Sequence, residues 1–438
     1  MARILIYTNI EEIEYAIWKP TEYSSIYREI QSERNGNWPN FANKLWLQGL
    51  VSEIYTEDNQ ISYGAEKYLP EEINEQFDIM ILSCANIFAV TYKELMEYYA
   101  KFFSQIHIPV YVISCGIQAD SYKELDLMVE QIGDVARKFI DSIYRTGGEF
   151  SLRGYFTKEF FDRLGKNSAV VTGCPSLYQT GRDLNITKQK LSEKELKPVV
   201  NGQNYMLSLK FYKEIFRNYT ESVYIDQDHY GMYLYDPDMR ELDELSFIKL
   251  SKLVKKEGYY GLRLATEGRL LYFADMPQWK RVLETEQFNF SIGARIHGNI
   301  MSILSGIPAC VHAWDSRTRE MAEFYDIPIV TDEEIKKKTL FEIYDEIDYS
   351  KFNLGYSKKY DLYEEFLCKC GIIRNHMNDK NLFFMNEDMA KTERPEIINK
   401  KKLSILGTEM RKKERMLLLE DEAFLKYREI KGKQYRMR

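Results

Sequence analysis

An arginine and a histidine two positions apart, Arg295 and His297, are the residues of this chain best placed to do chemistry. The apolar run 288–292 before them is typical of a short buried strand, and Gly298 and Asn299 after them open an apolar helical pattern. The pair therefore stands where the carboxyl end of a strand meets the amino end of a helix. Unpaired helix N–H groups attract anions there, and open α/β sheets bind ligands at such places. The guanidinium adds an anion contact, and the imidazole adds a titratable proton.

Two more arginines share this local setting. Arg153 follows the strand-like run 150–152, and Arg317 follows the strand-like run 309–313; each precedes a predicted helix. A positive charge at a helix start opposes the helix dipole, so an arginine kept there usually holds an anion or a carboxylate. The sequence predicts that the three arginines form an anion site around His297. The alternatives are pairing of each arginine with a nearby acid, and a buried helix-start histidine without a catalytic role.

Secondary candidates lie at the same kind of position. A small, polar loop directly follows the apolar strand predicted at 77–82, and two further residues flank the histidine at its helix start. These candidate substrate-binding residues are Ser83, Asn86, Ile296 and Asn299. His107, His312 and His376 show no constellation of chemical partners in the sequence. His229 follows two aspartates in a polar turn and is a weak catalytic candidate.

The bulk composition bounds the class of protein. The 438 residues suggest two or three domains, and 45% hydrophobic residues provide a sizeable core. A net charge of −7 argues against nucleic-acid binding driven by global charge. The six cysteines are scattered, and the spacing of Cys368 and Cys370 is wrong for a zinc knuckle, so no metal site is expected. No apolar run approaches the roughly 18 residues of a membrane span. We therefore expect a cytoplasmic protein.

The order of predicted elements indicates two α/β units. Strand and helix patterns alternate from residue 3 to residue 172, which predicts a mostly parallel sheet covered by helices on both faces. A polar stretch at 181–202 is interpreted as a connector, and a second alternation follows it. The predicted units are 1–180, a linker at 181–202, 203–385 and a charged helical tail at 386–438. Predicted details include a strand at 205–209, a helix at 239–257 and a helix capped by Asp332.

Three signatures are missing from the chain. It has no GxGxxG motif, no P-loop and no Gly-X-Ser-X-Gly elbow. A dinucleotide enzyme, a P-loop kinase and a serine hydrolase therefore all lack their usual motif.

Four stretches resemble the polysaccharide pyruvyltransferase family. They are 81–86, 108–118, 151–176 with its Ser-Leu-Arg and Thr-Gly-Cys-Pro blocks, and 294–318 with its Arg-Ile-His and Gly-Ile-Pro blocks. The resemblance implies a GT-B-like fold, in which two Rossmann-like lobes face a cleft and C-terminal helices follow. It also implies transfer of a pyruvyl group from phosphoenolpyruvate to two sugar hydroxyls of a surface polysaccharide, which forms a ketal and releases phosphate.

The resemblance assigns roles to the candidate residues. The arginine of the first block, the Arg-X-His pair and a later basic residue hold the donor, which points to Arg153, Arg295, His297 and Arg317. Protonated His297 would act as the general acid, with a pKa tuned near neutrality. Expected partners are phosphoenolpyruvate and a glycan or lipid-linked sugar, with no further cofactor and no nucleic acid. Peripheral association with the inner membrane face is an open alternative.

The chain also departs from the family pattern. Gly154 and Cys174 stand where aspartate is common, and Ser83–Asn86 replaces a glycine-rich loop. These departures concern the acceptor side more than the donor side, and no base for the sugar hydroxyl is identified. Two other functions stay open: a glycosyltransferase that uses a nucleotide sugar, and a non-catalytic glycan-binding subunit with the charged tail as its interaction element.

Overall fold

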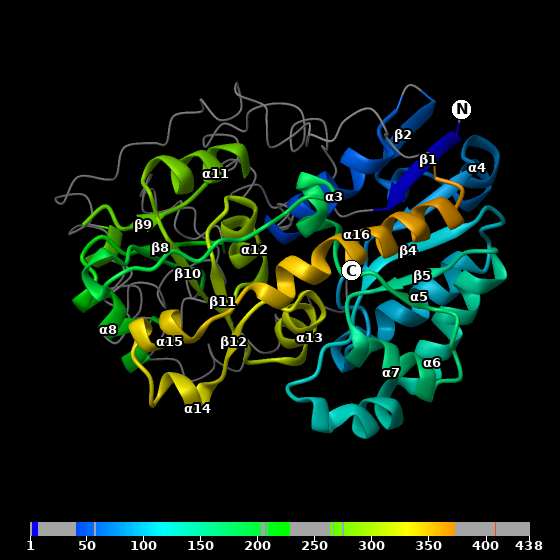
Figure 1. The fold of residues 1–438 in the computed structure, drawn as a ribbon. Coiled ribbons are helices and arrows are strands. Elements are labelled where there is room, and N and C mark those ends of the chain that lie inside the picture. Colours follow the sequence, from blue (N-terminus) through cyan, green and yellow to red (C-terminus); the bar gives the residue numbers. More distant parts are fainter. Residues whose placement is uncertain are drawn as a thin grey trace.

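The computed structural model describes residues 2–7, 41–56, 58–202, 206–207, 209–227, 263–265, 267–273, 276–372 and 408. Within these residues the chain forms two six-stranded sheets, and every strand pair is parallel. This arrangement confirms the predicted α/β fold with two lobes. Figure 1 shows the lobes side by side, the first in blue and cyan and the second in green and yellow.

The first lobe is built on a sheet of strand order β2-β1-β3-β4-β5-β6. Its strands are β1 (Ala2–Tyr7), β2 (Asn59–Tyr63), β3 (Ile79–Leu82), β4 (Val110–Cys115), β5 (Phe150–Leu152) and β6 (Val170–Val171). Every residue of β3, β4 and β5 is buried, because helices cover both faces of a parallel sheet. The helices are α3 (Phe41–Ile54), α4 (Pro70–Gln76), α5 (Lys93–Phe103), α6 (Leu125–Arg145), α7 (Tyr155–Arg163) and the 3₁₀ helix η4 (Pro175–Thr180).

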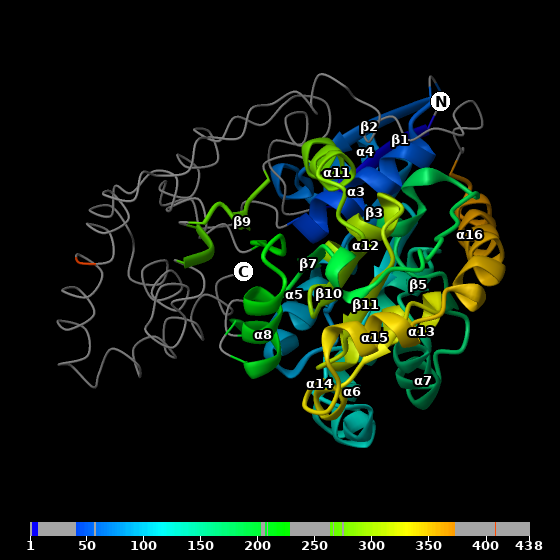
Figure 2. The same ribbon diagram turned by 60° about the vertical axis from the view of Figure 1, so that its left-hand side comes forward.

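The second lobe is built on a sheet of strand order β12-β11-β10-β7-β8-β9. Its strands are β7 (Pro198–Val200), β8 (Val223–Ile225), β9 (Leu270–Leu271), β10 (Phe290–Gly293), β11 (Ala309–His312) and β12 (Ile329–Val330). Its helices are α8 (Lys210–Asn218), α11 (Met276–Thr285), α12 (Ile296–Leu304), α13 (Ser316–Tyr325), α14 (Asp332–Ile335) and α15 (Leu340–Glu346). Helix α12 packs against α3 of the first lobe and stays beside it when the molecule is turned (Figure 2).

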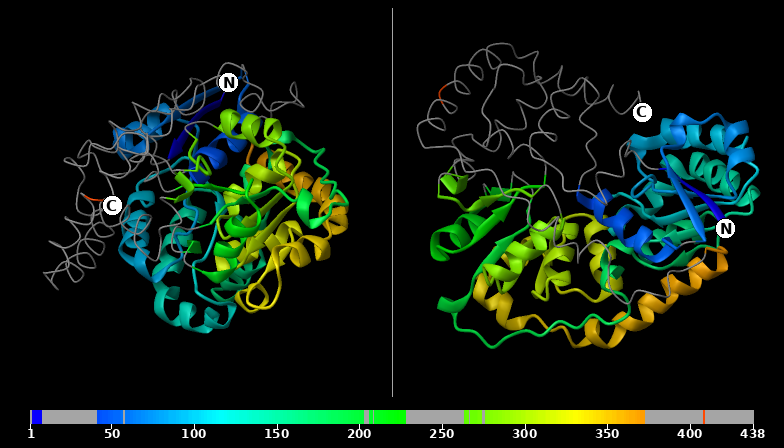
Figure 3. Two further views of the ribbon diagram at one scale, coloured as in Figure 1. Left: turned by 90° about the vertical axis from the view of Figure 1, so that its left-hand side faces the viewer. Right: turned by 90° about the horizontal axis from the view of Figure 1, so that it is seen from above.

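A long helix after the second sheet returns to the first lobe. This helix, α16 (Ser350–Lys369), runs from the second lobe to the first in Figure 1 and in the view from above in Figure 3. The Tyr360 hydroxyl donates to Glu53 Oε1 at 2.8 Å, and Arg182 forms an ion pair with Asp361 at 2.8 Å. The last helix of the second lobe therefore helps to hold the two lobes together.

The structure corrects several predicted elements. Residues 198–200, predicted as connector, form β7 in the interior of the second sheet. Residues 206–207, predicted within a strand, form a 3₁₀ turn. The edge strand β2 was not predicted, because Asn59–Tyr63 contains no apolar run. Thr331, and not Asp332, caps α14 by accepting from Glu334 N–H. The helix predicted at 239–257 and, apart from residue 408, the predicted tail at 386–438 lie outside the described residues.

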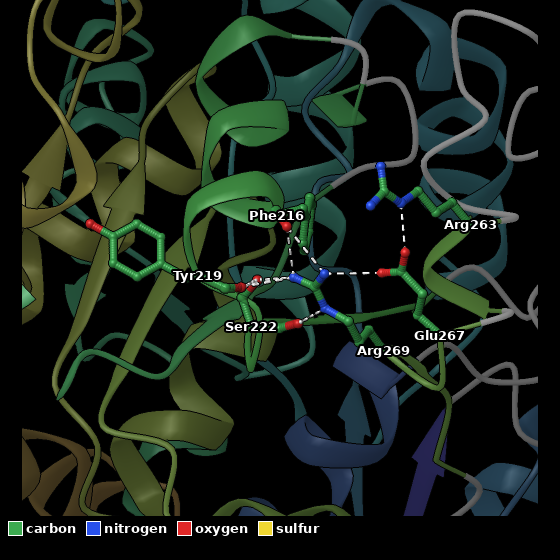
Figure 4. Close-up of polar contacts among 6 residues, drawn as sticks. All are labelled: Phe216, Tyr219, Ser222, Arg263, Glu267 and Arg269. Atoms are coloured by element: carbon green, nitrogen blue, oxygen red, sulfur yellow. Dashed lines mark hydrogen bonds and ion pairs between the residues drawn. The ribbon is translucent and has the colours of Figure 1, made fainter. Parts of the chain in front are cut away.

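An arginine closes the carboxyl end of α8. Arg269 donates to the carbonyl oxygens of Phe216, Tyr219 and Ser222 at 2.7–3.1 Å, and it also pairs with Glu267 at 3.1 Å. Figure 4 shows the guanidinium among these carbonyl groups, with Arg263 on the far side of Glu267. The last carbonyl groups of a helix have no partner within the helix, so a cation at this end is favourable.

Candidate functional site

The backbone between β10 and α12 is fixed by close contact with β7. Gly293 has φ +150°, and a Cβ atom there would lie 2.1 Å from the Asn201 carbonyl oxygen. The same carbonyl oxygen accepts from Arg295 N–H at 2.8 Å. Arg295 is the N-cap of α12, so the helix starts at Ile296, two residues before the predicted opening at Gly298. Arg295 and His297 therefore lie at the start of a helix at the carboxyl end of a strand, as predicted.

Asn299 holds the start of α12 against the end of β10. Its side chain is fully buried, and its amide group donates to the carbonyl oxygens of Gly293 and Arg295 at 2.8 and 3.2 Å. Its Oδ1 accepts from the Ser291 hydroxyl at 2.8 Å. These bonds hold the strand end against the first turn of α12. The polar atoms of Asn299 are engaged inside the protein, and the substrate contact predicted for this residue stays a prediction.

His297 is surrounded by the three predicted arginines. Its side chain is buried, and Nε2 lies 3.9 Å from Sγ of Cys174. Burial, and after it the charges of Arg153, Arg295 and Arg317, together lower the pKa of His297 to about 3. All three guanidinium groups are thus close enough to repel a proton on this one imidazole. They come from the two lobes, Arg153 from the first and the others from the second.

The protonation of His297 in the chain alone differs from the prediction. A pKa near neutrality was expected, but a group with a pKa of about 3 is neutral at pH 7. The sequence cannot reveal this shift, because it arises mainly from burial and partly from the charge of Arg153, which is distant along the chain.

Arg153 is held by the ends of two neighbouring strands. Its Nε donates to the Ser114 carbonyl oxygen at 3.0 Å, and its Nη1 donates to Asn86 Oδ1 at 3.1 Å. Ser114 is buried with φ +64°, a conformation uncommon for residues other than glycine. Strained backbone of this kind clusters at functional sites. Asn86 therefore joins the arginine cluster through Arg153, whereas Ser114 was not singled out, because φ has no reliable signature in a serine.

Arg317 has an acidic neighbour. Its guanidinium pairs with Asp315 at 2.6 Å, and Asp315 also caps α13 by accepting from Thr318 N–H at 2.9 Å. The alternative of pairing with a nearby acid is therefore realised for Arg317. Its side chain is still 27% exposed, and its charge still acts on His297, so it remains available to a bound anion.

The other two candidates lie beside this cluster. Ser83 follows β3 on the loop that carries Asn86, and its N–H donates to the Tyr7 carbonyl oxygen at 3.1 Å. Ile296 is the first residue of α12 and is buried. Ser83 is thus placed by the backbone at the carboxyl end of the first sheet. No hydrogen bond among the described residues joins it to the three arginines.

His312 has partners that the sequence did not indicate. Its Nδ1 lies 2.9 Å from the Tyr212 hydroxyl, and its Nε2 lies 2.8 Å from Asp332 Oδ1. The imidazole and the tyrosine are fully buried. The prediction that His312 lacks a constellation is therefore wrong, but this chain of groups joins α8 to α14 inside the second lobe and is a structural network.

A buried carboxylate from the second lobe caps a helix of the first. Glu320 on α13 accepts from the N–H and the hydroxyl of Thr157, at 3.0 and 2.9 Å, in the first turn of α7. Gly154 makes room for it, since a Cβ atom there would lie 3.0 Å from Glu320 Oε2. Burial raises the pKa of Glu320 to about 7. Sequence reasoning missed Glu320; the glycine at 154, in place of an acid at a helix start, was the available signal.

Helix α13 makes several polar contacts with the first lobe. Ser316 exchanges two hydrogen bonds with the backbone of Ala119, at 3.0 and 3.1 Å. The Tyr122 hydroxyl donates to Glu323 at 2.8 Å. The Tyr325 hydroxyl accepts from the N–H of Cys174 at 2.6 Å and donates to its carbonyl oxygen at 2.9 Å. The arginine cluster around His297 therefore lies where the two lobes meet.

The fold and this site define a class. Two parallel α/β lobes meet at a cluster of three arginines around a buried histidine, which is the two-lobed α/β arrangement predicted from the sequence. Residues 11–316 match the family model of polysaccharide pyruvyl transferase. The chain therefore belongs to the polysaccharide pyruvyl transferase family, as predicted from the four stretches above.

Solved structures show only distant likeness. The S. aureus MnaA–UDP co-structure has 11% identity, covers 85% of this chain and 98% of its own, and gives a TM-score of 0.40. The UDP-GlcNAc 2-epimerase from Neisseria meningitidis bound to UDP-GlcNAc has 12% identity, 84% and 100% coverage and a TM-score of 0.41. The glycosyltransferase SnogD from Streptomyces nogalater has 10% identity, 85% and 99% coverage and a TM-score of 0.34. None of the curated proteins matches the chain significantly in sequence.

Within the described part of the chain, metal-binding clusters and membrane-spanning helices are absent. No group of three or more His, Cys, Asp or Glu side chains there is arranged to hold a metal ion. None of its helices has the length and apolar character needed to cross a membrane.

Proposed function

We propose that this protein transfers a pyruvyl group from phosphoenolpyruvate to two hydroxyls of a sugar, forming a ketal and releasing phosphate. One observation carries the proposal: the charges of Arg153, Arg295 and Arg317 all act on the single buried imidazole of His297. Three guanidinium groups around one titratable group suit a small, highly charged anion. Membership of the polysaccharide pyruvyl transferase family supports the sugar acceptor.

The donor matches the cluster in charge and size. Phosphoenolpyruvate carries a phosphate and a carboxylate on a three-carbon frame, so its two anionic groups require several cationic contacts close together. Arginine binds both groups in a bidentate manner, and the N–H groups at the start of α12 add to the attraction. Arg153, Arg295 and Arg317 would hold the donor, while Ser83, Asn86 and Ile296 would line it.

The reaction balances with one acid. A proton adds to the methylene carbon of phosphoenolpyruvate, and the adjacent carbon becomes an oxocarbenium-like centre. One sugar hydroxyl adds to that carbon, the bond from the carbon to the phosphate oxygen breaks, and the second hydroxyl forms the other ketal bond. Of the two hydroxyl protons, one balances the new methyl group and the other leaves with hydrogen phosphate.

His297 is proposed as the acid that protonates the methylene carbon. In the chain alone its pKa of about 3 keeps it neutral. A bound trianion would oppose the charges of the three arginines and raise this pKa, because an opposite charge nearby favours the protonated form. Binding of phosphoenolpyruvate would therefore favour the protonated form of His297 that the reaction requires.

Incubation of the purified protein with phosphoenolpyruvate and an acceptor glycan tests the function. Release of phosphate together with a new ketal methyl signal in the glycan NMR spectrum is the expected result. Binding of UDP- or GDP-sugars in preference to phosphoenolpyruvate would instead identify a glycosyltransferase. Glycan binding without any donor binding in calorimetry would identify a non-catalytic subunit.

Substitution of the proposed acid gives the first prediction. We expect His297→Ala to lower kcat by about 10²- to 10⁴-fold, the usual contribution of a general acid. Phosphoenolpyruvate should still bind within a few-fold of the wild-type affinity, since the arginines remain. Stopped-time phosphate assays and calorimetry measure the two quantities. His107→Ala, at an exposed histidine in a loop of the first lobe, is the control. Unchanged kcat in His297→Ala would remove this residue from the mechanism.

A further inference from the structure

Cys174 contacts the imidazole that the proposed reaction uses. It follows β6 in the first lobe, whereas His297 lies on α12 of the second lobe, so the 3.9 Å approach of Sγ to Nε2 is a contact between lobes. The thiol is fully buried. A thiol is a weak donor and a weak acceptor, so it can hold a ring nitrogen without adding a charge.

The backbone of Cys174 is held by two hydrogen bonds from one side chain of the second lobe. One hydroxyl, that of Tyr325 on α13, binds both the N–H and the carbonyl oxygen of Cys174, at 2.6 and 2.9 Å. The preceding Gly173 has φ +76°, and a Cβ atom there would lie 2.2 Å from that hydroxyl oxygen. The second lobe therefore grips the segment that carries the thiol and sets the position of the thiol against His297.

The hydrogen bond that the sulfur of Cys174 accepts affects where its own hydrogen can point. The Ser176 hydroxyl donates to Sγ of Cys174 at 3.1 Å, which leaves the thiol hydrogen free to point at Nε2 of His297. An imidazole that accepts at Nε2 carries its proton on Nδ1 when neutral. When the ring is protonated, Nε2–H can donate to the sulfur, which is also a weak acceptor, and Nδ1–H is the proton left, among the described residues, for a donor molecule. Transfer of that proton leaves the neutral ring with its proton on Nε2.

We propose that Cys174 is a positioning residue for pyruvyl transfer, whose thiol, supplied by the opposite lobe, holds Nε2 of His297 and so selects Nδ1 for proton exchange. The inference rests on the proposed function, in which His297 is the acid. Because the thiol and the imidazole belong to different lobes, this role of Cys174 requires that the two lobes stay in contact. The charged groups that act on His297 are Arg153, Arg295 and Arg317.

Nitrogen NMR of the histidine ring tests the contact without any need for turnover. The full chain is labelled with ¹⁵N-histidine, and the His297 signals are assigned by their loss in His297→Gln. Wild type should show one neutral tautomer with the proton on Nδ1. Cys174→Ala should show a mixture of tautomers, and Cys174→Ser should restore the single form. An unchanged tautomer in Cys174→Ala overturns the proposal.

Kinetics give the second readout. With phosphoenolpyruvate as donor, Cys174→Ala should lower kcat about tenfold with KM changed less than threefold, and Cys174→Ser should recover most of the loss. Cys174→Asp places a carboxylate beside the ring and should raise the pH at which His297 titrates by at least two units, seen in the NMR titration. Cys310→Ala, at a buried cysteine on β11, controls for loss of core volume. Equal loss of kcat in Cys174→Ser and Cys174→Ala overturns the proposal.

The two sets of results separate two failures. A wild-type protein that releases no phosphate from phosphoenolpyruvate contradicts the proposed function, whatever the NMR spectra show. Normal phosphate release, with tautomer and titration of His297 insensitive to residue 174, contradicts only the role of Cys174.

Discussion

The buried carboxyl group of Glu320 is subject to opposing effects on its ionisation. Burial raises the pKa of Glu320 to about 7, while the hydrogen bonds from Thr157 and the charge of Arg153 act in the opposite direction. Because the folded-state pKa lies above the ordinary value of 4.5, the folded protein binds more protons than the unfolded chain between these two values. The resulting stabilisation is complete below pH 4.5 and is lost as the pH rises through 7.

Substitution of this carboxyl gives a pH-dependent prediction. Glu320→Gln keeps the size of the side chain and removes its titration. Between pH 5 and pH 8, the wild-type free energy of unfolding should fall more than that of the variant, by on the order of 3 kcal/mol. Urea unfolding at the two pH values measures the difference, and Glu323→Gln, on the exposed side of the same helix, is the control. Equal pH dependence in wild type and Glu320→Gln would contradict the assignment.

At the scale of single elements, the carboxyl end of α8 depends on one side chain from a distant segment. The guanidinium of Arg269 satisfies carbonyl groups of Phe216, Tyr219 and Ser222 while only 12% of the side chain is exposed (Figure 4). The planar fork of arginine reaches these oxygens at once, which a lysine ammonium cannot do. The helix end is therefore sensitive to the shape of this residue as well as to its charge.

We expect Arg269→Ala to lower the free energy of unfolding by about 2–4 kcal/mol, since it leaves buried carbonyl groups without their donors. Arg269→Lys should recover less than half of this loss. Chemical denaturation followed by circular dichroism measures both variants. Arg263→Ala should cost below about 1 kcal/mol, because its ion pair with Glu267 is exposed. A loss in Arg269→Ala as small as that in Arg263→Ala would show that the cap is dispensable.

At the scale of the whole molecule, the site exists only where the lobes meet. Helix α13 starts at the arginine cluster and contacts the first lobe through Ser316, Glu320 and Tyr325. Two glycines permit this approach, because a Cβ atom at Gly154 would lie 2.9 Å from the backbone oxygen of Glu320, and one at Gly173 would overlap Tyr325. The close approach of the two lobes therefore depends on glycine at positions 154 and 173.

Gly154→Ala tests this whole-molecule property. The residue has an extended backbone, so an alanine is not strained by its own conformation, and the added methyl group instead pushes α13 away from α7. We expect kcat/KM for phosphoenolpyruvate to fall at least tenfold and stability to fall by about 1–3 kcal/mol. Donor kinetics and thermal unfolding check both effects. Gly133→Ala in α6, where the nearest atom is the flexible end of Leu164, should change neither by much.

Local patterns predicted the elements that carry strong signals. The apolar runs that became β3, β4 and β10 were found because both faces of a parallel sheet are buried and their strands are continuously apolar. The edge strand β2 and the short β7 were missed, since Asn59–Tyr63 is largely polar and Pro198–Val200 has only three residues. Both form because neighbouring strands provide partners that a local pattern does not contain.

The sequence by itself determined the alternation of strands and helices, the placement of Arg153, Arg295 and Arg317 at the ends of strands, and the family. These follow from short-range periodicity and from the positions where strands meet helices. Only the tertiary structure decided that the three charges act on one imidazole, that its pKa falls to about 3, and that Glu320 and Cys174 reach across from the opposite lobe. The physical reason is that burial and Coulomb interactions depend on distances in space, and here they join residues more than a hundred positions apart.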